Sequence, residues 1–190
     1  MKSNPNFMKN LILIFLFLLS LDLSGQRIKE NYIDEFTGQS KVSTSWSNFI
    51  MGFSSSIYQR VIRIDNNTYL NLKVSLGLGK VFAVADGAKL LLKLQSDTVI
   101  TLNNLEYTIT SIGGGAYNIL GSRAMGASLY FLLSDEFVNI FSNFLVKKMR
   151  LYTTDGYYEK EIVPSYADKL KTACNLIKSI PAPEKKNLDF

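Results

Sequence analysis

Carboxylates are the residues of this chain whose type and spacing could carry out acid–base chemistry. Glu159 and Glu161 stand two residues apart in a predicted strand, so their side chains point to one face, about 7 Å apart. Two carboxylates that share a face are the minimum that a glycoside hydrolase needs. Lys148 and Arg150 are predicted to flank the same face, which favours an exposed ion-paired surface over a carboxyl group with a raised pKa.

The other acidic pairs give weaker signals. Asp34-Glu35 and Asp135-Glu136 are adjacent pairs, so the members of each point apart or lie in the first turn of a helix. A carboxylate-dependent, glycan-directed hydrolase built on Glu106, Glu159 or Glu161 is therefore an alternative function and not the favoured one.

The composition excludes most other routes to hydrolysis. The chain has 190 residues, no histidine and one cysteine, Cys174, which excludes a Ser-His-Asp triad, a Cys-His pair, a His-ligated metal site and an internal disulfide. No serine is followed three residues later by lysine, and there is no EF-hand loop or G-K-[ST] phosphate loop. We therefore predict no catalytic residue, no metal and no cofactor, while an irregular calcium site, which has no fixed spacing, stays open.

A glycine-rich segment, 113–126, is the first candidate for ligand contact. It holds five of the twelve glycines, and glycine permits positive φ and a close approach of a ligand to the backbone. The alternative is an ordinary connection between two strands, in which the glycines serve bulges and turns. The candidate contact residues in this segment are Gly113, Gly114, Gly115, Tyr117 and Arg123.

Tyrosines on a strand face are the second candidate. A tyrosine ring on an open sheet can stack on a sugar or contact a protein partner. Tyr152 and Tyr157 are predicted to share the exposed face of Glu159, so both are candidate ligand-binding residues. The alternative is that they are half-buried strand residues.

These candidates are positioned by elements that the hydrophobic pattern predicts to be mostly strands. Alternating apolar residues and turn residues indicate four hairpins, with shorter strands at 81–84, 105–111 and 128–133. The third hairpin has apolar residues on both faces, which indicates a central, covered position. The hairpins join Ile28–Phe36 to Lys41–Trp46, Ile57–Ile64 to Thr68–Leu76, Lys89–Gln95 to Val99–Asn103, and Lys148–Thr154 to Tyr157–Val163.

The length of each turn sets the predicted register. A three-residue loop at 65–67 places Ile62 opposite Leu70. In the last hairpin, a two-residue turn places Arg150 opposite Glu161 on the outer face.

Two helices complete the pattern. A short helix opens after Ser134, the predicted N-cap, and ends near Phe144. The last helix starts at Pro164-Ser165, where Ser165 and Asp168 have the spacing of a capping box. The predicted class is α+β, predominantly antiparallel, with about eight to ten strands in a curved sheet or open barrel, a short helix and a C-terminal helix packed on the sheet.

The start of the chain predicts export. Residues 1–25 combine a positive start, an unbroken apolar run at 11–19 and a short polar end with small residues, as in a secretory signal peptide. The run is short of the roughly 20 apolar residues that a membrane span needs; an uncleaved anchor is the alternative. With cleavage after Gly25, we expect a secreted or periplasmic protein with no transmembrane segment, one domain at 26–180 and a loose tail at 181–190.

The charge pattern argues against a nucleic-acid partner. The formal net charge is +5, and removal of residues 1–25, which contain two lysines and Asp22, lowers it to +4. This mild excess is spread along the sequence, whereas nucleic-acid-binding proteins concentrate basic residues on one face. The expected partner is an unknown protein or glycan, and the oligomeric state stays open.

Three stretches of the chain, together with the signal peptide, resemble a class of known proteins. They are 32–38 leading to 44–46, 105–109 before the glycine-rich segment, and 152–157 before the last helix. They resemble small secreted or periplasmic proteins of Gram-negative bacteria, which implies export and a single domain and brings no activity or functional residue. We therefore expect a secreted or periplasmic, non-enzymatic binding module. The alternatives are the hydrolase above and a structural subunit of a secreted assembly that pairs through an open sheet edge.

Overall fold

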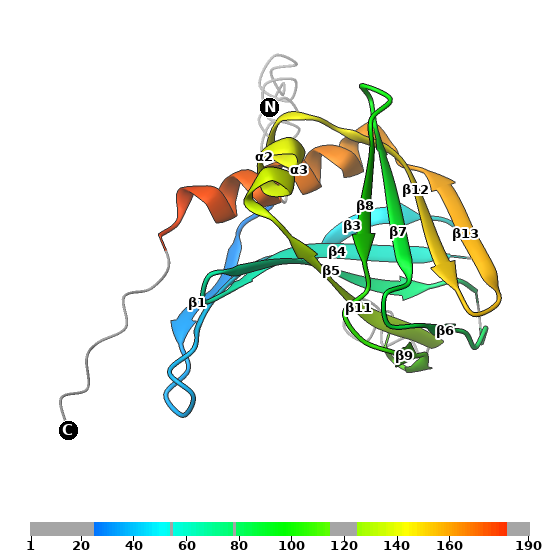
Figure 1. The fold of residues 1–190 in the computed structure, drawn as a ribbon, viewed down its shortest axis with the longest axis horizontal. Coiled ribbons are helices and arrows are strands. Elements are labelled where there is room, and N and C mark those ends of the chain that lie inside the picture. Colours follow the sequence, from blue (N-terminus) through cyan, green and yellow to red (C-terminus); the bar gives the residue numbers. More distant parts are fainter. Residues whose placement is uncertain (1–24, 54, 78, 115–124, 182–190) are drawn as a thin grey trace, which may run out of the picture.

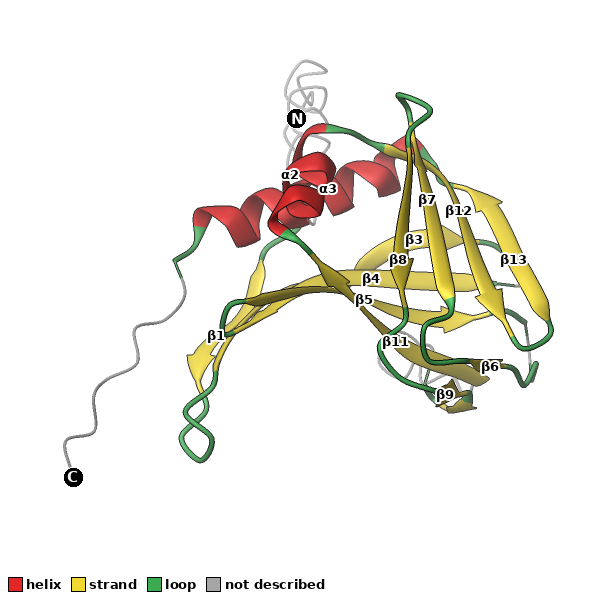
Figure 2. Cartoon of the chain, viewed as in Figure 1, coloured by secondary structure: helices red, strands yellow, loops and turns green. Residues whose placement is uncertain are grey.

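The computed structural model describes residues 25–53, 55–77, 79–114 and 125–181. Those residues form thirteen strands, all in antiparallel pairs, and two helices (Figures 1 and 2). This confirms the predicted α+β class, with antiparallel strands predominating and a C-terminal helix packed on a sheet. In the described part of the chain, no helix has the length and apolar character that a membrane crossing requires.

The larger sheet has seven strands and is strongly curved (Figure 2). They are β1 (Ile28–Ile33), β2 (Ser40–Thr44), β3 (Ser47–Met51), β4 (Ser56–Ile64), β5 (Asn67–Ser75), β10 (Ser111–Ile112) and β11 (Met125–Leu133). The hydrogen-bonded order is β1-β2-β4-β5-β11-β10, and β3 pairs with β4 next to β2. Because β2 and β3 pair with successive stretches of β4, they follow it as one bent ribbon.

The second sheet has four strands that cross the first steeply (Figure 1). They are β7 (Lys89–Leu94), β8 (Val99–Asn103), β12 (Val146–Thr153) and β13 (Gly156–Glu161), in the order β13-β12-β7-β8. A short pair, β6 (Ala83–Val84) with β9 (Thr108–Ile109), joins one end of this sheet. There, the backbone N–H of Thr154 donates to the carbonyl of Ala83 at 2.9 Å.

One hydrophobic core lies between the two sheets and is closed at one end by the helices. The predicted alternation of β5 is confirmed, because its inward residues are fully buried while their neighbours face away from the core. The inward residues of β5 and of β7, opposite it, are Leu70, Leu72, Val74, Leu90, Leu92 and Leu94.

The helices are α2 (Asp135–Asn143) and α3 (Pro164–Ser179). Ser134 is the N-cap of α2, as predicted, and its hydroxyl accepts from the Phe137 N–H at 3.2 Å. The capping box predicted for α3 is wrong: Val163 is the N-cap, and no side chain caps that end. Proline in the first turn makes such a cap less necessary, since it has no N–H to satisfy.

Helix α3 packs on β2, β3 and β4 through the apolar stripe that the sequence predicts. Arg63 of β4 secures its last turn: its guanidinium donates to the carbonyls of Ile177 at 3.1 Å and Ile180 at 2.5 Å. Burial raises the pKa of the Cys174 thiol to about 12, so this cysteine is a protonated core residue.

The turn between β4 and β5 is shorter than predicted. It contains two residues, 65–66, so Ile62 pairs with Tyr69 and not with Leu70. Asp65 has a φ of 50°, which aspartate tolerates better than most residues and which tight hairpin turns use. The one-residue change places Ile62 on the opposite face of the sheet from Leu70, where its side chain is still buried.

The last hairpin is also displaced from its predicted register. Its turn is formed by 154–155, Gly156 opens β13 with a φ of 116°, and Arg150 pairs with Glu159 instead of Glu161. The register differs from the prediction by two residues. Because side chains alternate with a period of two, every side chain keeps its predicted face. The predicted ion-paired surface is thereby formed with Glu159.

Two predictions about the middle of the chain are wrong. The hairpin of β7 and β8 is not covered on both faces: β8 is the last strand of its sheet, and Val99 is 52% exposed. The stretch 105–111 is broken, since Thr110 separates β9 from β10 and its N–H donates to the Phe82 carbonyl. Because of such short strands, the described residues contain more strands than the eight to ten that the sequence predicts.

Candidate functional site

The candidate site lies on the outer face of the four-stranded sheet. Leu151 of β12 points into the core and is fully buried, so alternation turns Arg150 and Tyr152 to the opposite face. The register of the neighbouring strands places Glu159 of β13 and Leu91 of β7 on either side of Arg150. Strand β7 and the hairpin of β12 and β13, which are distant in sequence, therefore meet at one point.

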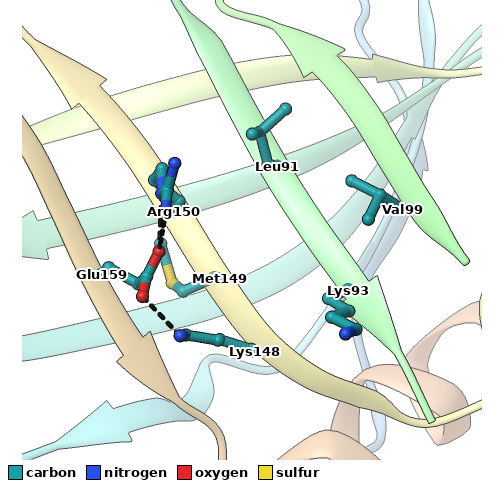
Figure 3. A pocket seen from close by; sticks show the side chains of 7 residues that line it. All are labelled: Leu91, Lys93, Val99, Lys148, Met149, Arg150 and Glu159. Carbon is teal, nitrogen blue, oxygen red and sulfur yellow. Dashed lines mark hydrogen bonds and ion pairs between the residues drawn. The ribbon is translucent and has the colours of Figure 1, made fainter. Parts of the chain in front are cut away.

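These side chains surround an open groove of about 250 Å³ (Figure 3). Leu91 and Val99 provide apolar surface on one side, next to Lys93 of β7, and Lys148, Arg150 and Glu159 stand on the other side. Pockets for small molecules usually hold about 300–1,000 Å³, so this groove fits one sugar ring or one side chain of a larger ligand. The lining residues are Leu91, Lys93, Val99, Lys148, Met149, Arg150 and Glu159.

Glu159 is held between two cations. Its Oε2 accepts from Arg150 Nε at 2.6 Å and lies 2.5 Å from Arg150 Nη2, while Lys148 Nζ contacts Oε1. Lys148 and Arg150 together hold the pKa of the Glu159 carboxyl below its ordinary value of 4.5. The carboxylate therefore stays ionised at neutral pH and has no proton to donate as a general acid.

Two tyrosines form the rim of the site next to Arg150. The rings of Tyr152 and Tyr157 lie 6.0 Å apart at 52°, and the Arg150 guanidinium carbon lies 4.5 Å from the centre of the Tyr157 ring. Tyr152 and Glu159 raise the pKa of Arg150 above its ordinary value. Arg150 is thus oriented by three neighbours, while Tyr157 remains 61% exposed and free to contact a ligand.

The two sequence-predicted surfaces do not form one site in the described residues. Tyr152 and Tyr157 come together on the four-stranded sheet, whereas Gly113 and Gly114 follow β10 in the other sheet. Gly113 has a φ of 80°, and a Cβ on Gly114 would lie 2.3 Å from the Gly126 carbonyl oxygen, so both glycines are required by the local backbone. The other candidates, Gly115, Tyr117 and Arg123, lie outside the described residues.

Sequence reasoning missed the apolar side of the groove. Leu91 and Val99 were expected to be covered, because apolar residues on both faces of a hairpin are typical of a central strand. In the structure the outer face is open, and the same pattern becomes a partly exposed apolar patch beside charged groups. The apolar residues on both faces of this hairpin are visible in the sequence. Whether they are covered or exposed depends on the strand order, which the sequence pattern does not give.

The remaining carboxylates do not build a second acidic site in the groove. Glu106 lies exposed in the loop after β8 and does not line the groove. Asp34 accepts from the N–H groups of Phe36 and Thr37 and stabilises the turn after β1. Over the ranges that the structure describes, no group of three or more acidic or cysteine side chains could hold a metal ion.

Three comparisons were made, with models of known protein families, with curated proteins and with solved structures, and none finds a match to this chain. The function is therefore inferred from the geometry of the groove.

Proposed function

We propose that this chain is an exported, non-enzymatic binding module that holds a glycan in the groove on the outer face of the four-stranded sheet. The observation that carries the proposal is the position of Tyr157, an exposed aromatic ring at the rim, beside the paired charges of Arg150 and Glu159. Export is inferred from the apolar start of the sequence, residues 1–25.

The chemistry of the groove suits a sugar. One face of a sugar ring is apolar and can lie against an aromatic ring or the apolar surface of Leu91 and Val99. Sugar hydroxyls both donate and accept hydrogen bonds, and the groove offers an acceptor in Glu159 beside donors in Lys148 and Arg150. Because both cations already contact Glu159, a neutral ligand can bind without breaking an ion pair.

The hydrolase alternative is not supported by the state of Glu159. A glycosidase needs a protonated carboxyl on one side of the bond, usually with a raised pKa. The two cations beside Glu159 lower its pKa instead. Binding without cleavage is the function that this arrangement favours.

The test is a glycan array probed with the purified protein, followed by titration of the best glycan. We expect Tyr157→Ala to weaken binding about tenfold or more, a loss of about 1.4 kcal/mol. Tyr32→Ala is the matched control, because Tyr32 is 44% exposed and lies on β1 of the seven-stranded sheet, outside the groove.

Two results would contradict the proposal. One is a Tyr157→Ala variant that binds the glycan as tightly as the wild-type protein does. The other is an array on which no glycan binds while peptides do, which would favour the protein ligand and a role in a secreted assembly through the open edges at β8 and β13.

A further inference from the structure

The outer face of the seven-stranded sheet carries a separate cluster around Trp46, the one tryptophan of the chain. Val61 of β4 and Leu72 of β5 point into the core and are fully buried. Strand alternation therefore turns Arg60 and Lys73 to the outer face, where Trp46 lies across them. This cluster shares no residue with the groove on the four-stranded sheet.

Two cations lie against the same indole ring. The guanidinium carbon of Arg60 is 4.5 Å from the ring centre of Trp46, and Lys73 Nζ is 4.7 Å from it. Burial, together with the nearby positive charge of Arg60, lowers the pKa of Lys73, so the two like charges repel each other. An anion in contact with both cations would relieve this repulsion.

The guanidinium of Arg60 is fixed before any ligand arrives. Its Nε donates to Asn71 Oδ1 at 3.0 Å, and the Asn71 side chain is fully buried. Asn71 Nδ2 in turn donates to Ser128 Oγ at 3.2 Å and to the Leu129 carbonyl at 3.0 Å. This chain of hydrogen bonds across β4, β5 and β11 orients the guanidinium and uses only its Nε donor.

The carboxylate next to the cluster does not balance its charge. Glu30 accepts from the Ser43 hydroxyl at 2.6 Å, pairs with Lys41 at 3.2 Å and lies 3.7 Å from Arg60 Nη1. Among the described residues, no carboxylate forms an ion pair with Lys73. Three cations and one carboxylate leave an excess of two positive charges on this face.

We propose that Arg60 and Lys73, beside Trp46, form a binding site for a tetrahedral oxyanion, sulfate or phosphate, either free or as an ester on a larger molecule. Arg60 is suited to contact two oxygens through its planar fork, and Lys73 to contact a third as a point charge. The two charges of free sulfate equal the unbalanced charge of the cluster. The cluster faces away from the core, and the side chain of Arg60 is 16% exposed.

Trp46 provides the measurement, because the fluorescence of a single tryptophan reports on the site directly. The full protein is titrated with sodium sulfate at constant ionic strength, with sodium chloride as the balancing salt. We expect a saturable change in emission with sulfate. Lys73→Met should weaken sulfate binding at least tenfold, and Lys73→Arg should restore most of it.

Two further arms complete the test. Lys93→Met, a lysine of the groove on the other sheet, is the control and should leave sulfate binding unchanged. Glucose 6-phosphate is titrated beside inorganic phosphate, because the two carry similar charges near neutral pH; tighter binding of the ester would show that the natural ligand is a larger molecule, and equal binding would indicate the free ion. An emission change that follows ionic strength alone, or that is the same in Lys73→Met, would overturn the proposal.

Discussion

At the scale of single residues, Glu159 distinguishes a binding surface from an acid catalyst. Its carboxylate is 25% exposed and paired with Lys148 and Arg150. Exposed ion pairs add little to folding stability, since water screens them and the side chains lose freedom. The main effect of these ion pairs is therefore to hold the Arg150 guanidinium against the exposed ring of Tyr157.

The pH dependence of Glu159 follows from the direction of its pKa. Because the pKa in the folded protein lies below the ordinary value of 4.5, the ion pairs contribute stability above that pH and lose it as the pH falls through the folded pKa. We expect the Glu159 carboxyl carbon, followed by NMR, to titrate with a midpoint below 4.5. Lys148→Met should move this midpoint upward. A wild-type midpoint above 4.5 would show that the carboxyl is not held as described.

At the scale of elements, the two helices begin in different ways. The Ser134 hydroxyl accepts from the first turn of α2, whereas Ser165 lies inside α3 and caps nothing. We expect Ser134→Ala to lower the free energy of unfolding by about 1 kcal/mol, and Ser165→Ala to change it by less than about half of that. Urea denaturation of both variants measures the difference. Equal losses would indicate that the capping box at Ser165 forms after all.

The elements also show what a sequence can predict. The alternation of β5 and the Ser134 cap are local patterns, so both are predicted correctly. Turn length is harder, because Asp65 permits a left-handed φ without requiring it. The last hairpin has the same difficulty: its turn uses 154–155 and leaves Gly156 to open the next strand. In the last hairpin the predicted faces are right and the partners are wrong, whereas in β4 the predicted face of Ile62 is wrong as well.

At the scale of the whole molecule, the groove depends on contacts that no local pattern reveals. Leu91 belongs to β7 and Arg150 to β12. The two residues meet because β12 pairs with β7, although four strands and helix α2 lie between them in the chain. The sequence predicted the charged and aromatic half of the site, which lies within one hairpin. It did not predict the apolar half, which requires the order of strands.

We propose that the outer face of the four-stranded sheet holds the ligand. Amide chemical-shift mapping by NMR, with the glycan that binds most tightly on the array, finds the contact surface without any mutation. We predict that the largest shifts occur in β7, β12 and β13, around Leu91, Arg150 and Tyr157. Largest shifts in the seven-stranded sheet or at Gly113 and Gly114, with the groove unchanged, would contradict the claim.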